Sequence, residues 1–218
     1  MRTVCYDLFC GLGGWSEGFL LEGYRCIGFD IEVHDYGAGG YPGELMIRDV
    51  RSIHGFELKD ATCIVASPPC QEYSYRAMPW KRAKELPPPD NALFDACYRI
   101  QREAIAAAGH HIPLIVENVR GAQKWVGQAR WNYGSFYLWG DVPALMPFGS
   151  PRKFHASGSI WFDSGTRDSM LGQLGPASFW SGSWERKAAS ALIAKIPLPL
   201  SQHIARVYLP AGAREDGA

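Results

Sequence analysis

The sequence predicts a doubly wound α/β fold with a mostly parallel sheet. Short apolar runs of strand length recur along the chain, a glycine-rich turn follows the first run, and reactive or polar side chains follow two later runs. A strand, a glycine turn and a helix form the opening unit of such a sheet, which binds ligands at the carboxyl ends of its strands. A chain of 218 residues is long enough for one such domain and a small appendage.

The opening unit comes from the first 30 residues. A buried strand is predicted over residues 3–8, a glycine turn over Gly11-Leu12-Gly13-Gly14, a helix over 16–21 and a second strand over 26–29, which ends in Asp30. An acidic residue in that place can accept hydrogen bonds from both hydroxyls of a ribose. A dinucleotide fingerprint would have a third glycine where this chain has Ser16, so another nucleoside ligand is favoured. Residues 36–43 are rich in glycine and are expected to form a surface loop.

A candidate nucleophile follows the next apolar run. Residues 61–66 predict a buried strand, and Ser67-Pro68-Pro69-Cys70-Gln71 comes directly after it. The two prolines remove backbone donors and restrict the chain, so the turn is stiff. A cysteine on a rigid turn at a strand end is well placed as a nucleophile. For an arbitrary cysteine a buried structural thiol is the more common case, and the context of the other motifs favours the nucleophile here.

The segment over residues 72–90 is rich in proline and polar residues, so no regular element is predicted there. We interpret it as a lid that closes on phosphates, with a surface insertion as the alternative. Asn91 is expected to cap a helix that covers the sheet, and residues 112–116 predict the next strand, with Glu117-Asn118 at its end. Cys70 and Glu117 should therefore lie at the same edge of a parallel sheet.

The remainder of the chain is less regular. Residues 131–138 predict one strand, 141–185 are loop-like with basic and aromatic residues, and helices are predicted around 186–193 and over 200–208. Basic and aromatic side chains in such a segment suit phosphate contact and base packing, although the tryptophans could equally form a small core. Residues 211–218 are expected to be a disordered tail.

Composition favours a soluble globular protein. Lysine plus arginine and aspartate plus glutamate number 22 each, so any nucleic-acid contact would need a local basic face, and the basic residues after Cys70 and Glu117 could supply it or be ordinary solvated charges. No apolar stretch approaches about 20 residues and the start lacks a secretory signal, so we expect a cytoplasmic protein with no membrane contact. The six cysteines form no zinc-ligand pattern, so neither a metal nor a disulfide framework is expected.

Three segments in order resemble the DNA (cytosine-5) methyltransferase family: Asp7-Leu8-Phe9-Cys10-Gly11-Leu12-Gly13-Gly14, Pro69-Cys70-Gln71 and Val116-Glu117-Asn118-Val119. The resemblance extends from Tyr6 to about Leu138. It implies the Rossmann-like fold of S-adenosylmethionine-dependent methyltransferases, with a small irregular appendage. It divides the chain into a catalytic and cofactor-binding domain (1–140), a very short target-recognition region (141–185), helices that return to the catalytic domain (186–210) and a tail (211–218).

The resemblance also implies roles for individual residues. Cys70 would add to carbon 6 of a flipped cytosine, Glu117 would hydrogen-bond ring nitrogen 3, Asn118 would brace the site and Arg130 would hold the base or its phosphate. S-adenosylmethionine would lie against Phe9, Gly11, Gly13, Gly14, Asp30, Ile31, Asp49 and Pro69, with Asp30 on the ribose, Ile31 on adenine and Asp49 on its amino group. Double-stranded DNA would be contacted by Gln71, Ser74, Arg76, Lys81, Arg82, Arg152 and Lys153.

The chain departs from the family pattern in two places. Asn132 stands where the segment Gln128-Ala129-Arg130 would continue to a second arginine, and Ala194-Lys195-Ile196 stands where the terminal motif has Gly-Asn-Ser. A transfer-RNA cytosine methyltransferase, a catalytically silent DNA-binding protein of the same fold and a cysteine hydrolase therefore remain as alternatives. The short recognition region suggests a target of roughly two to four base pairs or a partner protein, and a monomer is favoured.

Overall fold

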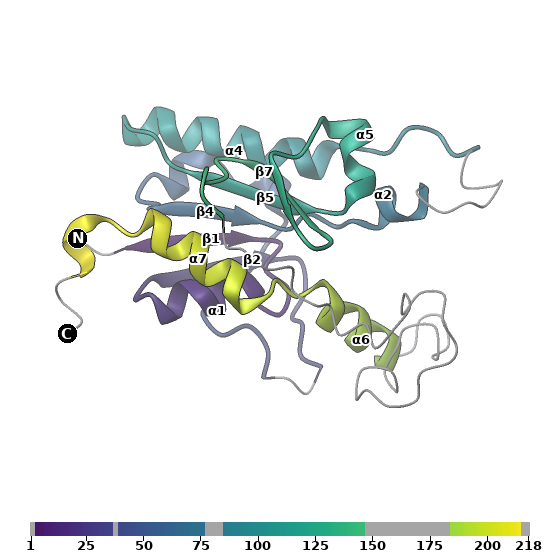
Figure 1. Cartoon of the computed structure of the whole chain (residues 1–218), viewed down its shortest axis with the longest axis horizontal. Helices are drawn as coiled ribbons and strands as arrows, with labels where there is room; N and C mark the ends of the chain where they lie inside the picture. Colours follow the sequence, from purple (N-terminus) through teal and green to yellow (C-terminus); the bar gives the residue numbers. More distant parts are fainter. Residues whose placement is uncertain (1–2, 37–38, 77–84, 147–183, 215–218) are drawn as a thin grey trace.

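The computed structural model describes residues 3–36, 39–76, 85–146 and 184–214 of the chain (Figure 1). Its centre is a seven-stranded sheet in the order β3-β2-β1-β4-β5-β7-β6. The strands are β1 (Val4–Leu8), β2 (Arg25–Asp30), β3 (Glu44–Ile47), β4 (Cys63–Ala66), β5 (Leu114–Asn118), β6 (Trp131–Tyr133) and β7 (Phe136–Gly140). The first five strands are parallel, whereas β7 runs antiparallel to both β5 and β6. The predicted doubly wound, mostly parallel α/β fold is confirmed.

Helices cover both faces of the sheet. They are α1 (Gly14–Leu21), α2 (Gln71–Arg76), α4 (Ala92–Ala108), α5 (Gln123–Val126), α6 (Trp184–Ala194) and α7 (Leu198–Tyr208), with short 3-10 turns η1 (Val50–Ser52), η2 (Gly55–Leu58), η3 (Arg120–Ala122) and η5 (Ala211–Arg214). Figure 1 shows α4 along one side of the sheet and α1 and α7 along the other.

Alternation along the strands divides the core into two layers. Tyr6 and Ile64 belong to the layer beneath α4, whereas Cys5 and Val65 belong to the layer beneath α1 and α7. Successive side chains of a strand point to opposite faces of the sheet, and strands buried on both faces read as unbroken apolar runs. That is why the short runs of β1, β4 and β5 were visible in the sequence.

Several elements differ from the predictions. The predicted strand over 131–138 is a hairpin of β6 and β7, because Gly134 has a positive φ of 62° and turns the chain between them. The segment after Cys70 begins with the helix α2, which was not expected. Asn91 provides no side-chain cap for α4; the adjacent Asp90 accepts the Ala92 N–H at 2.8 Å instead.

Three smaller differences concern loops and ends. The edge strand β3 was not predicted, since three of its four side chains are exposed and it lacks an apolar run. In the segment expected to be a surface loop, Tyr41 packs inward, and its hydroxyl lies 2.6 Å from Ser16 Oγ. Residues Ala211–Arg214 form a 3-10 turn where a disordered tail was expected.

Candidate active site

The carboxyl ends of four neighbouring parallel strands lie in register. Leu8 of β1 is aligned with Phe29 of β2 and with Ala66 of β4, which is in turn aligned with Val116 of β5. The residues that follow these four are therefore brought to one edge of the sheet: the glycine turn, Asp30, the Cys70 turn and Glu117. The sequence predicted that the strands before Cys70 and Glu117 would end at the same edge, and the parallel pairing of β4 with β5 confirms it.

The turn that carries Cys70 is anchored from three directions. The Ser67 N–H donates to the Leu8 carbonyl at 3.1 Å, and the Ser67 hydroxyl accepts the indole N–H of Trp15 at 3.0 Å. The Asn118 side-chain amide donates to the Pro68 carbonyl at 2.9 Å. Both Trp15 and Asn118 are almost fully buried. The prolines and these contacts together fix the backbone from which Cys70 projects.

Cys70 differs from the other five cysteines in its surroundings. It is half-buried, whereas the others are buried, and none of the six is in a disulfide. Burial raises the pKa of the Cys10, Cys63 and Cys97 thiols well above the usual value, so these side chains act as small apolar groups. The Cys70 carbonyl accepts the Ser74 N–H at 2.8 Å, which places the thiol directly before the first turn of α2. The exposure of Cys70 suits a reactive thiol.

Glu117 and Asn118 are the last two residues of β5 and are 9% and 1% exposed. The Asn118 carboxamide oxygen accepts the N–H of Val119 at 2.8 Å, while its nitrogen holds Pro68. One buried amide thus links the strand end that carries Glu117 to the turn that carries Cys70. Its four hydrogen-bonding positions make Asn the side chain best suited to such a bridge.

Arg130 lies at the start of the β6–β7 hairpin, next to β5. Its N–H donates to the Leu138 carbonyl at 2.8 Å, and its side chain is exposed. Leu138 is the register partner of Glu117 on β7. Arg130 therefore lies directly before β6, which is one strand further from Glu117 than β7.

The glycine turn between β1 and α1 combines unusual backbone angles with close packing. Phe9, Gly11 and Gly13 have positive φ angles of 58°, 48° and 71°, a conformation that is costly for a residue such as Phe9. A Cβ on Gly13 would clash with Pro42, and one on Gly14 would lie 2.5 Å from the Ile196 nitrogen. A Cβ on Gly11 would meet no atom within 4 Å. Gly11 alone of these three glycines borders open space, and the other two serve packing.

Asp30 and Ile31 form the other wall beside this turn. Asp30 is 9% exposed, and its carboxylate accepts the Gly11 N–H at 2.9 Å and the Ile31 N–H at 2.8 Å. The Ile31 side chain is 70% exposed. An acidic strand end, an apolar side chain in solvent and an open glycine face together fit a nucleoside with a hydrophobic base. These residues fit S-adenosylmethionine, whose sulfonium supplies an electrophilic methyl group when it is bound.

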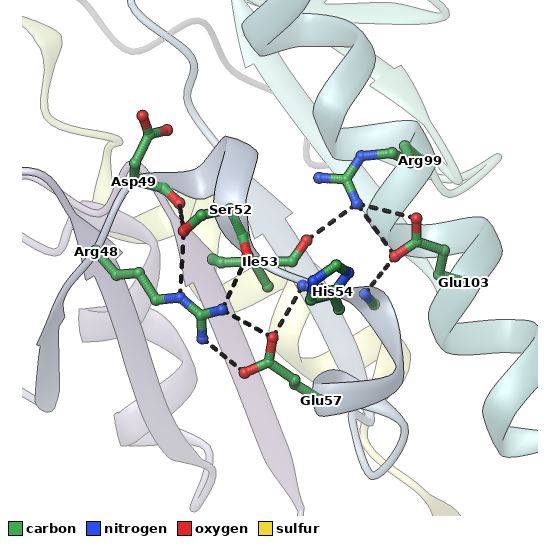
Figure 2. A network of polar contacts seen from close by, with 9 residues as sticks. Arg48, Asp49, Ser52, Ile53, His54, Glu57, Arg99 and Glu103 are labelled. Carbon is green, nitrogen blue, oxygen red and sulfur yellow. Dashed lines mark hydrogen bonds and ion pairs between the residues drawn. The ribbon is translucent and has the colours of Figure 1, made fainter.

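Asp49, the predicted partner of the adenine amino group, already has a partner in this structure. Its carboxylate accepts from the Arg51 guanidinium at 2.7 Å and from the Arg51 N–H at 2.9 Å, and these contacts hold its pKa below the usual value. Figure 2 shows the carboxylate of Asp49 pointing away from the adjacent polar network, in which Arg48 binds Glu57 and Arg99 binds Glu103. Contact with adenine would require Asp49 to exchange Arg51 for the amino group.

A buried carboxyl group lies behind the glycine turn and was missed by the sequence reasoning. Asp7 is 1% exposed, one of its oxygens accepts the Ser16 hydroxyl at 2.7 Å, and its other oxygen has no hydrogen-bond partner among the described residues. Burial raises the pKa of Asp7 to about 8. The Ser16 side chain, at the position of the absent third glycine, therefore ties α1 to β1. The only sequence signal was an acidic residue within an apolar strand.

The predicted DNA-contacting residues are only partly described. Gln71 and Ser74 lie on α2, with Gln71 exposed, and Arg76 ends that helix. Residues 77–84 and 147–183 lie outside the described part of the chain. The contacts predicted for Lys81, Arg82, Arg152 and Lys153, the lid and most of the recognition region therefore remain predictions.

The helix α7 and the segment before it pack against the glycine turn and α1. Lys195, which stands where the family pattern has asparagine, forms an ion pair of 2.5 Å with Glu17 of α1. A Cβ on Gly18 would clash with the backbone of α7 at Ser201 and Gln202. The segment before α7 thus lies directly against the start of α1.

The fold and the strand-end site define a Rossmann-like domain of the S-adenosylmethionine-dependent methyltransferase type. The family model for C-5 cytosine-specific DNA methylase matches residues 3–125, more than half of the chain. The chain belongs to this family. Among the described residues, no group of three or more side chains could hold a metal ion, and no helix is long and apolar enough to cross a membrane.

Solved structures with a similar fold are distant in sequence. A putative DNA modification methyltransferase encoded within a prophage of E. coli is 23% identical over 57% of this chain and 34% of its own, with a TM-score of 0.41. The Dnmt2 methyltransferase of S. pombe is 16% identical, with coverages of 57% and 36% and a TM-score of 0.38. The methyltransferase EhMeth of Entamoeba histolytica is 16% identical, with coverages of 57% and 40% and a TM-score of 0.39. The chain spans little more than a third of these structures, and no curated protein matches it.

Proposed function

We propose that this chain methylates carbon 5 of a flipped cytosine in double-stranded DNA, using S-adenosylmethionine as the methyl donor and Cys70 as a covalent nucleophile. The observation that carries the proposal is the hydrogen bond between the Asn118 amide and the Pro68 carbonyl. It links the two strand ends that bear a half-buried thiol and a buried carboxyl group, which are the two side chains that the chemistry requires.

Cytosine carbon 5 is a poor nucleophile until the ring is activated. The Cys70 thiolate forms a bond to carbon 6, and Glu117 donates a hydrogen bond and proton to ring nitrogen 3, so that the ring becomes an enamine. Carbon 5 then takes the methyl group, whose bond to sulfur breaks. Loss of the carbon 5 proton to a base or to solvent, departure of the Cys70 thiolate and return of the nitrogen 3 proton to Glu117 restore the aromatic ring. Extrusion of the base from the duplex costs about a few kcal/mol.

The remaining residues of the site hold the reactants. Asn118 keeps the Cys70 turn at a fixed place relative to Glu117, and Arg130 binds the base or its phosphate. Asp30 accepts from the ribose, Ile31 packs on adenine, and Gly11 allows the nucleoside to approach the backbone. Phe9, Gly13 and Gly14 shape the turn, and Pro69, the residue before the nucleophile, contacts the cofactor. Basic residues after Cys70 and in the recognition region would bind the DNA phosphates.

Transfer of label from S-adenosylmethionine tests the proposal. Purified wild type, Cys70→Ala and the control Cys97→Ala, which removes a buried thiol of α4, are incubated with duplex DNA and separately with transfer RNA. The expected product is 5-methyldeoxycytidine from wild type and the control, with a loss of at least about 1000-fold in Cys70→Ala, because the covalent step is removed.

A second readout examines the covalent step directly. Duplex DNA with 5-fluorocytosine should remain bound to wild type through Cys70, because fluorine replaces the proton that must leave carbon 5. Label that appears only in transfer RNA would overturn the choice of DNA. Absence of label in both nucleic acids together with absence of cofactor binding would overturn the enzyme proposal and leave a catalytically silent DNA-binding protein of the same fold.

A further inference from the structure

The carboxylate of Asp30 is unusually well supplied with donors. Among the residues that the structure describes, two backbone N–H groups donate to it, that of Gly11 to Oδ2 at 2.9 Å and that of Ile31 to Oδ1 at 2.8 Å. The ring of His34 is the third neighbour, with Nε2 at an ion-pair distance of 3.3 Å from Oδ1. A carboxylate offers about four acceptor positions. About one acceptor position therefore remains open, on Oδ2, whereas the two hydroxyls of a ribose need two acceptor positions on the carboxylate.

A second contact holds the His34 ring beside Asp30. Its Nδ1 lies 3.2 Å from the Tyr36 hydroxyl, and the centroids of the two rings are 6.0 Å apart. One tautomer suits both neighbours, because Tyr36 can donate to Nδ1 while the protonated Nε2 faces the Asp30 carboxylate. The Tyr36 ring in turn meets the edge of Trp184, the first residue of α6, at 6.2 Å. His34 is thus held on Asp30 by a chain of aromatic contacts.

Of these three neighbours of Asp30, only the His34 side chain can move away from the carboxylate. The Gly11 and Ile31 N–H groups belong to backbone that is fixed by the glycine turn and by the end of β2. The His34 side chain lies beyond the strand end, is 20% exposed, and makes the longest of the three contacts. Glu32, 3.9 Å from Nδ1, offers an alternative acceptor when the ring turns away.

We propose that His34 lowers the affinity of this site for a complete ribose, because it occupies the ribose position on Asp30 until a nucleoside with both ribose hydroxyls displaces it. This proposal rests on the proposed use of S-adenosylmethionine and deepens it. Displacement exchanges the contact of His34 with Oδ1 for a hydrogen bond from the ribose, so binding of the complete ribose gains less than it would at a carboxylate without this neighbour. Asp30 needs no help from His34 to keep its orientation, because two backbone N–H groups already fix it.

Calorimetric titration with S-adenosylhomocysteine tests the proposal on wild type, His34→Phe and Tyr36→Phe, with His110→Phe as a matched control on an exposed histidine elsewhere. His34→Phe keeps a ring but lacks a donor, and it should bind S-adenosylhomocysteine about 3- to 10-fold more tightly, the worth of one net hydrogen bond. Tyr36→Phe, which frees His34 from its tautomer partner, should change the affinity in the same direction by less. The control should match wild type.

The 2′-deoxy analogue of S-adenosylhomocysteine identifies the cause. It needs only one position on Asp30, so His34→Phe should gain little affinity for it. Equal or weaker binding of S-adenosylhomocysteine by His34→Phe would overturn the proposal for His34 while leaving the cofactor assignment intact, as would an equal gain for both ligands. Absence of binding to wild type would overturn the cofactor assignment and the role of His34 together.

Discussion

At the scale of single residues, Asp7 is an acidic side chain in an almost completely buried site. One of its oxygens accepts the Ser16 hydroxyl and the other has no partner among the described residues, in a site that is 1% exposed. Burial raises its pKa from 3.8 to about 8. Because an ionised carboxylate would be costly in this place, the folded protein keeps Asp7 protonated at neutral pH.

This raised pKa predicts a pH-dependent stability. Between about pH 4 and pH 8 the unfolded chain has released the Asp7 proton and the folded chain retains it, so the free energy of unfolding falls as pH rises through this window. The stability that protonated Asp7 contributes is fully present below the pKa of Asp7 in the unfolded chain and is lost as pH rises through the pKa of Asp7 in the folded protein. In urea titrations from pH 5 to pH 8.5, Asp7→Asn should show a shallower decline than wild type, while Asp60→Asn, at an exposed carboxylate, should be parallel to wild type. A parallel decline in Asp7→Asn would place the pH dependence elsewhere.

At the scale of elements, the sequence was most informative where strands are buried on both faces. The runs of β1, β4 and β5 are wholly buried. They lead to the three segments of the candidate site, which are the glycine turn, the Cys70 turn and Glu117-Asn118. The edge strand β3 was missed, since an edge strand needs no apolar run. The hairpin of β6 and β7 was predicted as a single strand, because a glycine can turn the chain in the middle of an apolar run. Asp49 matched the family pattern, but its pairing with Arg51, two residues further on, depends on the η1 turn.

The contact between α1 and the Cys70 turn could not be predicted from the sequence either, because a tryptophan after a glycine turn is most simply interpreted as a residue of the hydrophobic core. Trp15 and Ser67, 52 positions apart, share one hydrogen bond of 3.0 Å. Trp15→Phe and Ser67→Ala should each destabilise the protein, and the double variant should lose less than the sum, with a coupling of about 0.5–1.5 kcal/mol. Urea denaturation of the four proteins measures this coupling. Additive losses would mean that the hydrogen bond contributes nothing to the stability of the turn.

At the scale of the whole molecule, a segment from the last part of the chain packs against the helix that follows the glycine turn. Figure 1 shows α7 beside α1, which follows the glycine turn. Gly14 packs on the Ile196 backbone, Glu17 pairs with Lys195, and Gly18 lies against the backbone of α7. The segment from Lys195 to Gln202 therefore forms part of the support for the glycine turn. The ion pair of Lys195 supplies a structural contact where the family pattern has asparagine.

Close packing of α7 on α1 reverses the usual effect of one substitution. In an exposed helix, Gly→Ala stabilises by about 0.5–1 kcal/mol, but a Cβ on Gly18 would clash with the Ser201 side chain and the Gln202 nitrogen. Gly18→Ala should therefore lower the free energy of unfolding by about 1–3 kcal/mol, the usual cost of overpacking. It should also weaken S-adenosylhomocysteine binding, because the displaced α7 carries Ile196 away from the glycine turn. Urea denaturation and calorimetry measure the two effects, and an unchanged or higher stability would show that α7 yields to the added methyl group and that the turn does not depend on it.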